Sequence, residues 1–293
     1  AEPAPDCAGR LDRLARLRAV VADNEERFRQ AISADFGHRS TVETAIAETM
    51  LVLGEIKHAA RHLKSWMAPQ KIPTTVQFAP AKNRLIPQPL GVVGIIAPWN
   101  YPLQLTLAPA VAAIAAGNSA IIKPSELVPH FSALLKQLIA EKFDATEILV
   151  TGIEDEIAKA FAALPFDHLV FTGSTRVGRL VAEAAGRNLT PVTLELGGKS
   201  PNIFFKDVCA EDDDFFDKAI EGFVMFALNQ GEVCTCPSRA LIHESIYDRF
   251  MERALKRVAA ITQGSPLDPS TMIGAQASSE QLEKILSYIA IGK

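Results

Sequence analysis

This sequence of 293 residues has no large excess of charge of one sign and no long apolar run. Its 30 basic and 34 acidic residues leave a formal net charge of −4, which gives no electrostatic basis for binding nucleic acid. Its longest apolar stretch, residues 105–116, is interrupted by Pro109, whereas a membrane-spanning helix needs roughly 20 apolar residues. We therefore expect neither a nucleic-acid partner nor a membrane span.

Cysteine is also rare. The four cysteines, Cys7, Cys209, Cys234 and Cys236, are too few for a disulfide framework in a chain of this length. The first five residues show neither the basic nor the apolar region of a secretory signal. Both features favour a reducing, cytoplasmic compartment. What remains is an ordinary globular composition, 48% hydrophobic and 22% charged, long enough for about two domains.

The first 68 residues are predicted to form two helices. Apolar residues recur at helical spacing over residues 11–32 with charges between them, and Gly37 ends the pattern. Ser40 with Glu43 three residues later is a capping-box signature for the second helix, which is expected to run to about Met67.

Proline dominates the next segment. Five prolines lie between residues 69 and 89, mixed with apolar side chains. Because proline is excluded from central strands, this segment is predicted to be an extended arm or an edge strand.

From Gly91 onward, short apolar runs alternate with amphipathic segments of helical length. The runs lie at residues 92–97, 120–122, 147–150, 168–171 and 192–196. The segments between them centre on residues 103–116, 130–142, 155–163 and 175–187. Apolar strands separated by helices are what a parallel sheet covered on both faces requires. The sequence therefore predicts an α/β fold with a doubly wound, parallel, Rossmann-like sheet.

A second α/β segment follows the predicted sheet. Helices are expected near residues 212–229 and 245–261. Few residues lie beyond the sheet, which is short for a second domain with a core of its own. We therefore expect the second domain to be incomplete.

Two strand-to-helix junctions are candidate sites for a phosphate or a ribose. Gly173-Ser174-Thr175-Arg176-Val177-Gly178 opens a helix, whose backbone N–H groups and dipole can hold a pyrophosphate. Its spacing matches neither the dinucleotide fingerprint nor a Walker A loop, and a plain turn explains it equally well. Lys123-Pro124-Ser125-Glu126 ends the second strand, where open α/β sheets bind ligands. Its charged pair could bracket a ribose, or these residues could simply start a helix.

The segment Gly231-Glu232-Val233-Cys234-Thr235-Cys236-Pro237 holds two candidate nucleophiles. A zinc site would need partners at C-x-x-C or H-x-x-x-H spacing, which His243 alone does not supply. A nucleophilic thiol needs activation by its surroundings or a nearby base, and no histidine flanks these cysteines. Small buried cysteines after a helix explain the pattern about as well.

Two polar side chains follow predicted strands. Glu195 ends an apolar strand just before two glycines, and burial there would suit a general base. Asn100, in Pro98-Trp99-Asn100-Tyr101-Pro102, could donate a hydrogen bond to a developing oxyanion. The alternatives are a glutamate that faces solvent and an asparagine that serves a turn.

Taken together and in this order, the motifs resemble the aldehyde dehydrogenase superfamily. They are Pro98-Trp99-Asn100-Tyr101-Pro102, Lys123-Pro124-Ser125-Glu126, Phe171-Thr172-Gly173-Ser174-Thr175, Glu195-Leu196-Gly197-Gly198-Lys199-Ser200-Pro201 and Gly231-Glu232-Val233-Cys234. The resemblance runs over essentially the whole chain. Up to about Leu189 it is to coniferyl-aldehyde and fatty-aldehyde types, and from about Asn202 to the bacterial acetaldehyde type. We hypothesise a mosaic joined within residues 192–201, which a single natural parent gene spanning the join would contradict.

The resemblance implies a chemical role for three residues. Cys234 matches the catalytic thiol that attacks an aldehyde to give a thiohemiacetal, and Asn100 matches the side-chain donor to its oxyanion. Glu195 matches the general base for the water that hydrolyses the resulting thioester. The implied activity is NAD(P)-dependent oxidation of a small aldehyde to a carboxylic acid, in which covalent capture splits the reaction into two easier steps.

The resemblance also implies a cofactor site and no metal. Lys123 and Glu126 match contacts to the adenosine ribose, and Gly173 with Ser174 matches the pyrophosphate turn. The full set of implied cofactor-binding residues is Trp99, Lys123, Ser125, Glu126, Gly173, Ser174, Gly178, Leu196 and Gly197. A carboxylate near the ribose repels a 2′-phosphate, so Glu126 favours NAD, with NADP as the alternative cofactor.

Members of the family have a further C-terminal third, with a Glu-x-Phe motif for the nicotinamide ribose and the end of an oligomerisation arm. We therefore expect a fragment, with an NAD(P)-binding domain at residues 1–198 and a truncated α/β catalytic domain at residues 199–293. Residues 69–90 would belong to the arm. A homodimer or homotetramer is the assembly that the resemblance implies.

Three other functions stay open. An acylating aldehyde dehydrogenase would pass the acyl group to coenzyme A, although Glu195 as a hydrolytic base argues against it. A thiol esterase would use Cys234 and an oxyanion hole without any cofactor. An inactive dinucleotide-binding fragment or assembly module would bind NAD without turnover. The dependence of turnover on the cofactor separates these functions.

Overall fold

The computed structural model describes residues 4–293, the side chain at position 155 excepted. The chain folds as two units, and each is described by itself. Unit 1 consists of the described residues up to Asp35 together with Thr41–Glu195, and unit 2 of Phe36–Ser40 and Leu196–Lys293. None of the helices in the described part of the chain has the length and apolar composition needed to cross a membrane.

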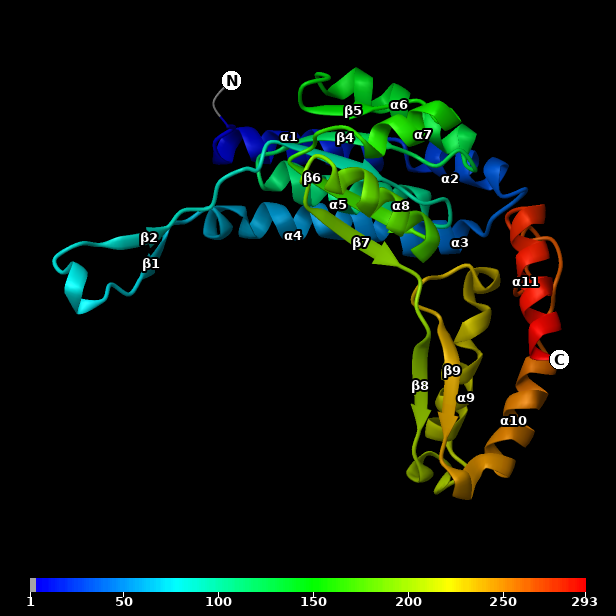
Figure 1. The fold of residues 1–293 in the computed structure, drawn as a ribbon. Coiled ribbons are helices and arrows are strands. Elements are labelled where there is room, and N and C mark those ends of the chain that lie inside the picture. The colour runs from blue at the N-terminus through cyan, green and yellow to red at the C-terminus, as the bar shows by residue number, and fades with distance from the viewer. Residues whose placement is uncertain (1–3) are drawn as a thin grey trace. The chain divides into compact units, whose positions relative to one another are not determined.

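Unit 1 begins with a layer of helices (Figure 1). They are α1 (Cys7–Ala22), α2 (Glu25–Asp35), α3 (Thr41–Thr44), a π-helical turn (Ala45–Thr49) and α4 (Met50–Trp66). The prediction of two helices here is wrong in number. A turn at Asp23 and Asn24 separates α1 from α2, but Val21 and Phe28 on either side are both fully buried. Because the apolar positions stay in phase across the turn, periodicity alone does not reveal it.

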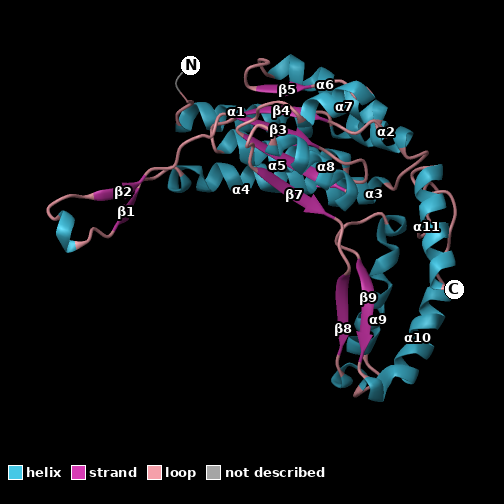
Figure 2. Cartoon of the chain, viewed as in Figure 1, coloured by secondary structure: helices cyan, strands magenta, loops and turns pink. Residues whose placement is uncertain are grey.

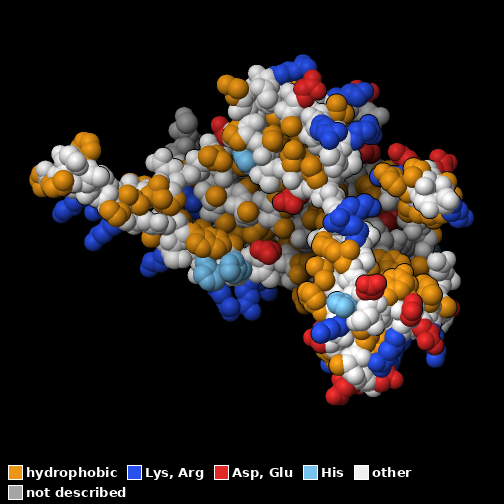
Figure 3. Space-filling model, turned by 60° about the horizontal axis from the view of Figure 1, so that its bottom comes forward, with side chains coloured by type: hydrophobic (Ala, Val, Ile, Leu, Met, Phe, Trp, Pro, Cys, Tyr) orange, Lys and Arg blue, Asp and Glu red, His pale blue; other side chains and the backbone are white. Residues whose placement is uncertain are grey.

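A hairpin arm follows α4. It consists of β1 (Gln70–Ile72) and β2 (Asn83–Leu85), paired antiparallel, with a 3-10 turn (Val76–Phe78) between them. Its strands are exposed along their whole length, and hydrophobic side chains follow the arm in the space-filling view (Figure 3). The extended, edge-strand structure predicted from the prolines is confirmed.

The centre of unit 1 is a five-stranded sheet of order β5-β4-β3-β6-β7 (Figure 2). Its strands are β3 (Val92–Ile96), β4 (Ser119–Lys123), β5 (Ile148–Val150), β6 (His168–Gly173) and β7 (Val192–Leu196). The pairs β3–β4, β3–β6 and β4–β5 are parallel. All five strands lie where the apolar runs predicted them, within one or two residues.

Four helices connect these strands. They are α5 (Pro102–Ala115), α6 (Pro129–Lys142), α7 (Asp155–Ala162) and α8 (Thr175–Gly186). The chain runs outward from β3 through β4 to β5, and then returns to the other side of β3 as β6. Right-handed crossovers therefore place α5 and α6 on one face of the sheet and α8 on the other. The predicted doubly wound α/β fold is confirmed.

Unit 2 contains a two-stranded parallel sheet and three helices. They are β8 (Ser200–Phe204), α9 (Asp214–Val224), β9 (Pro237–Ile242), α10 (Tyr247–Ala259) and α11 (Ser279–Gly292). The helix predicted over residues 212–229 ends early, because Leu228, Asn229 and Gln230 leave helical geometry. The strands β8 and β9 and helix α11 were not predicted. Although unit 2 is short, it has a buried cluster of its own around Phe216 and Phe250, contrary to expectation.

Candidate functional site

The loop after β3 carries Asn100. Trp99 and Asn100 are half-buried in it, and Tyr101, at the N-cap of α5, is buried. The Tyr101 hydroxyl donates to Glu43 Oε1 at 3.0 Å. The N–H of Ala97 donates to the carbonyl of Lys123 at 3.0 Å, so the ends of β3 and β4 are held side by side.

The end of β4 places a charged pair beside this loop. The Lys123 side chain is 5% exposed, and its Nζ donates to Glu126 Oε2 at 2.6 Å. Partial burial acts to raise the pKa of Glu126, but the hydrogen bond from Lys123, a backbone hydrogen bond and the charge of Lys123 together outweigh it, and the pKa is lowered. Ser125 is buried, and its Oγ accepts from the N–H of Leu127 at 3.3 Å. The predicted pair therefore exists, with each partner fixing the other.

The end of β6 forms the predicted turn into α8. Ser174 is the N-cap, and its Oγ accepts from the N–H of Val177 at 3.3 Å. A side chain at Gly173 would lie 2.6 Å from the ring of Phe171, so this turn requires glycine. Among the described residues, the N–H groups of Thr175 and Arg176 donate to no protein acceptor. The first turn of α8 therefore has donors available for an anion.

These loops share one edge of the sheet, at the point where the strand order reverses. The carboxyl ends of the parallel strands β3, β4 and β6 meet there. Ligands of doubly wound sheets bind at such an edge. An ammonium–carboxylate pair suits the hydroxyls of a ribose, and a helix N-terminus suits a pyrophosphate. The residues present thus fit a dinucleotide. Gly178 is buried one turn into α8.

The end of β7 differs from its prediction. Glu195 is exposed, so the burial expected of its side chain is not found, while its role as a general base stays a prediction. The reason is that β7 is an edge strand whose side chains alternate between half-buried and exposed. Leu196 is half-buried and Gly197 exposed, and both belong to unit 2, whereas Glu195 is the last residue of unit 1.

The thiol Cys234 lies in a turn between α9 and β9, in unit 2. It is an exposed free cysteine. Three consecutive residues before it have positive φ, at 46° for Asn229, 56° for Gln230 and 81° for Gly231. Left-handed geometry at two residues other than glycine costs of order 1–3 kcal/mol each and is typical of functional sites. The backbone is therefore strained at Asn229 and Gln230, a few residues before the thiol.

Two residues that sequence reasoning missed hold this turn in place. Glu232 is 4% exposed, and its Oε1 accepts from the N–H of Ala277 at 2.9 Å. Its own N–H donates to the carbonyl of Asn229, a buried residue, at 2.9 Å. The sequence held one signal for their role: a charged residue lies two positions before a cysteine and follows the segment Asn-Gln-Gly.

The geometry separates the two cysteines of the segment. Cys236 is half-buried, and its Sγ donates to the carbonyl of Met225 at 3.3 Å. Cys234 faces solvent. Of the two candidate nucleophiles, Cys234 is therefore the accessible one.

The predicted site residues thus form two groups. Unit 1 brings together Asn100, Lys123 and Glu126 with the turn at Gly173 and Ser174. Unit 2 carries Cys234. The described part of the chain holds no cluster of three or more potential metal ligands, and a site without metal stays a prediction.

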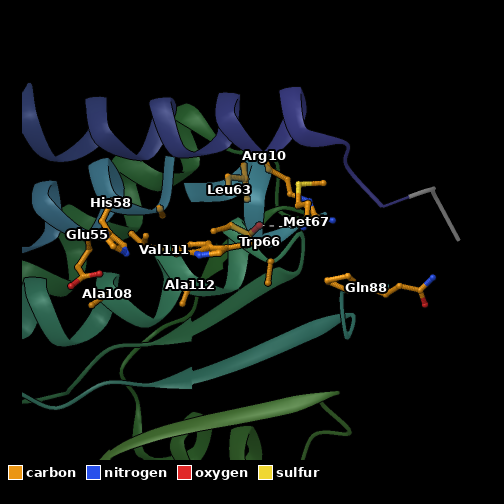
Figure 4. Close-up of a pocket in the computed structure, with 14 residues that line it drawn as sticks. Arg10, Glu55, His58, Leu63, Trp66, Met67, Gln88, Ala108, Val111 and Ala112 are labelled. Atoms are coloured by element: carbon orange, nitrogen blue, oxygen red, sulfur yellow. Dashed lines mark hydrogen bonds between the residues drawn. The ribbon is translucent and has the colours of Figure 1, made fainter. Parts of the chain in front are cut away.

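A cavity of about 330 Å³ lies elsewhere in unit 1. It is lined mainly by apolar side chains of α4 and α5, with Arg10, Glu55 and His58 among its polar groups (Figure 4). The Nη1 of Arg10 donates to the carbonyl of Ala115 at 3.2 Å. None of the predicted site residues lines this cavity. This cavity is therefore separate from the candidate site.

Comparison with sequences of known proteins gives long matches. The model of the aldehyde dehydrogenase family matches residues 5–293. Acetaldehyde dehydrogenase 2 of Cupriavidus necator is 61% identical over 208 residues, 70% of this chain and 41% of its own length. An aldehyde dehydrogenase of Rhodospirillum rubrum is 48% identical over 284 residues, 96% of this chain and 55% of its own length. The chain spans about half the length of these relatives.

Solved structures agree with the sequence matches. The substrate-bound AldH of Staphylococcus aureus is 33% identical, with a TM-score of 0.84 over 97% of this chain and 61% of its own. The NAD⁺ complex of an aldehyde dehydrogenase from Bacillus cereus is 26% identical, with a TM-score of 0.85 over 98% of this chain and 57% of its own. The resemblance found in the sequence motifs is confirmed, and the chain belongs to the aldehyde dehydrogenase family.

Proposed function

We propose that this chain supplies the cofactor site and the thiol of an NAD(P)-dependent aldehyde dehydrogenase that forms carboxylic acids. One observation carries the proposal: an exposed thiol, Cys234, follows a strained turn inside a chain whose residues 5–293 match the family. The relative from Cupriavidus necator is named for acetaldehyde, which supports a small aldehyde as substrate.

Each step of the proposed reaction uses a group of this chain. The thiolate of Cys234 attacks the aldehyde carbon, and the carbonyl electron pair moves to oxygen as the C–S bond forms. The side-chain N–H of Asn100 and the backbone N–H of Cys234 donate to that oxyanion. When bound, the nicotinamide cofactor would supply the hydride acceptor; loss of hydride from the former aldehyde carbon lets the oxyanion re-form the C=O bond and leaves a thioester on Cys234. Glu195 then takes a proton from the water that attacks the thioester, and the C–S bond breaks to release the acid and the thiolate.

The cofactor would be held by unit 1. Lys123 and Glu126 would hydrogen-bond the adenosine ribose, and the free N–H groups at the start of α8 would hold the pyrophosphate. One solved neighbour is an NAD⁺ complex of an aldehyde dehydrogenase from Bacillus cereus, and another is an NADP-dependent enzyme of Escherichia coli, so NADP stays the alternative cofactor. The carboxylate of Glu126 favours NAD, because it would repel a 2′-phosphate.

Domain boundaries, location and assembly belong to the same proposal. Residues 1–198 form the NAD(P)-binding domain and residues 199–293 the start of the catalytic domain. The four free thiols fit a reducing, cytoplasmic compartment. The exposed hairpin arm within residues 69–90 supports a homodimer or homotetramer.

NADH formation by the purified chain tests the proposal. Supplied with NAD⁺ and a panel of aliphatic and aromatic aldehydes, the chain should release NADH without coenzyme A. Cys234→Ala should abolish turnover and spare NAD⁺ binding, whereas the matched control Cys236→Ala should retain both. Equal rates with Cys234→Ala would contradict the mechanism. Turnover that requires coenzyme A would favour the acylating alternative, and NAD⁺ binding without turnover the inactive fragment.

The general base has its own test. Glu195→Gln should slow thioester hydrolysis, so that an acyl adduct on Cys234 accumulates and is detected by mass spectrometry. Unchanged steady-state rates with no adduct would assign the base to another residue.

A further inference from the structure

Two buried carboxylates of the N-terminal helices accept hydrogen bonds from the helices that follow β3 and β4, next to the sheet edge proposed to bind the cofactor. Glu48, in the π-helical turn, is fully buried. Its Oε2 accepts from the N–H groups of Leu103 at 2.6 Å and Gln104 at 3.0 Å. These are the second and third residues of α5, the helix that follows the Asn100 loop.

Asp35 makes the equivalent contact with α6, the helix that follows β4. It is the last residue of α2, and its side chain is fully buried. Its Oδ1 accepts from the N–H of His130 at 3.0 Å, and its Oδ2 from the N–H of Phe131 at 2.9 Å. These are the second and third residues of α6, the helix that follows the loop Lys123–Glu126.

Local sequence gives neither α5 nor α6 a cap. Their N-cap residues, Tyr101 and Val128, make no side-chain capping bond, and each helix begins with a proline. By contrast, α8 is capped by its own N-cap residue, Ser174. Free N–H groups at a helix start need an acceptor, and a carboxylate there is further stabilised by the helix dipole. At α5 and α6 the acceptor comes from a distant helix instead.

We propose that Glu48 and Asp35 are positioning residues. Glu48 holds the β3–α5 loop, which carries Trp99 and Asn100, and Asp35 holds the β4–α6 loop with its Lys123–Glu126 pair. The roles of the two loops rest on the proposed function, but the hydrogen bonds that hold them do not. The N-terminal helices therefore fix the position of the oxyanion donor through Glu48 and the position of the ribose contacts through Asp35.

The test compares Glu48→Ala and Asp35→Ala in a Trp66→Phe background, where Trp99 is the only tryptophan. Glu48→Ala should speed amide hydrogen exchange at Leu103 and Gln104 about tenfold or more, since each loses its acceptor. It should also shift the emission of Trp99. Asp35→Ala should speed exchange at His130 and Phe131, weaken NAD⁺ binding about tenfold and leave Trp99 emission unchanged.

Conservative variants separate positioning from general stability. Glu48→Gln keeps a single oxygen that can accept both N–H groups, so it should restore the exchange rates and Trp99 emission of the parent. Asp35→Asn keeps one acceptor but turns its NH₂ group toward the other N–H, so it should restore them only in part. Asp6→Ala is the matched control, because Asp6 caps α1 through Gly9 at 2.8 Å, away from both loops.

The outcomes are distinct. The proposal is overturned if Glu48→Ala leaves exchange at Leu103 and Gln104 unchanged, or if both alanine variants loosen both loops equally. If the parent chain binds no NAD⁺, the proposed function fails, but the exchange and emission measurements still decide whether each carboxylate holds its own loop.

Discussion

Unit 1 and unit 2 are both α/β, yet they bury their strands very differently. In unit 1, Val93, Gly94 and Ile95 of β3 are buried in succession, because helices cover both faces of the sheet. In unit 2, β9 is exposed or half-buried along its whole length. Most buried apolar side chains of unit 2 gather instead in one cluster, which includes Phe204, Phe216 and Phe250. Unit 1 therefore distributes its stabilisation over a sheet, whereas unit 2 concentrates it.

One ion pair from each unit shows a similar difference in burial. In unit 1, Glu147 accepts hydrogen bonds from Arg13 and Arg16, and its side chain is only 18% exposed. In unit 2, Arg257 pairs with Glu221 across α9 and α10, and the Glu221 side chain is 58% exposed. Because solvent screens exposed pairs, the Arg16–Glu147 pair should contribute more than the Arg257–Glu221 pair.

The largest effect should come from breaking the cluster of unit 2. Phe250 is fully buried, with its ring centroid 4.5 Å from Phe204 and 6.1 Å from Phe216. Phe250→Ala should lower the free energy of unfolding of unit 2 by about 3–5 kcal/mol. Denaturant unfolding followed by circular dichroism should then show an early transition, while NAD⁺ binding by unit 1 survives.

A matched variant in unit 1 completes this test. Phe131 is equally buried and lies 5.9 Å from Phe28. Phe131→Ala should weaken NAD⁺ binding and leave the transition of unit 2 in place. A single shared transition in both variants would show that the two units do not unfold separately.

A smaller effect, roughly 2 kcal/mol after solvent screening, is expected at Glu147. Its hydrogen bond to Arg16, opposed by partial burial, lowers the pKa of Glu147 from 4.5 to about 2. A lowered folded-state pKa stabilises the protein above pH 4.5, and this contribution is lost as pH falls toward 2. Glu147→Gln should therefore destabilise unit 1 at pH 7 and converge with the parent in acid. Urea unfolding at pH 7, 4.5 and 3 measures the difference.

Glu221→Gln is the control for that comparison. The hydrogen bond from Arg257 also lowers the pKa of Glu221, but the exposed pair should contribute under about 0.5 kcal/mol. Equal losses in the two variants would remove the distinction between the ion pairs of the two units.

The same contrast explains how much of the fold the sequence predicts. The strands of unit 1 appear as continuous apolar runs because both of their faces are buried, so their positions could be predicted closely. The strands β8 and β9 contain proline and polar residues such as Ser200 and Arg239, so no apolar run marks them. Their pairing depends on contacts with α9 and α10, which a local pattern does not contain.

The candidate site divides in a similar way. Lys123, Glu126 and Ser174 follow strands that the sequence reveals, so their place at one edge could be predicted. Glu48 and Asp35 could not, because each acts on a helix far away in the chain and neither belongs to a motif. The strain at Gln230 could not be predicted either, since glutamine has no preference for left-handed backbone that a sequence would reveal.

Relieving the backbone strain at Gln230 should raise the stability of unit 2 modestly. Gln230 has φ of 56°, and its contact with Gln276 uses its backbone carbonyl, so glycine preserves the contact. Gln230→Gly should stabilise unit 2 by about 0.5–1 kcal/mol, because glycine adopts this geometry without a steric penalty. Urea unfolding measures the gain. A loss of stability would mean that the Gln230 side chain supports the thiol turn.

The smallest effect on unfolding, within about 0.5 kcal/mol, is expected in the arm, whose side chains contact solvent. Val76 is 83% exposed and Phe78 is 69% exposed, so Val76→Asp and Phe78→Asp should leave the unfolding of both units unchanged. If the arm joins subunits, the same variants should lower the mass measured by light scattering. Leu255→Asp, at an exposed position of α10 in unit 2, is the control. A mass change in that variant alone would place the subunit contact on unit 2, because a charge blocks association only where the apolar side chain is buried by a partner.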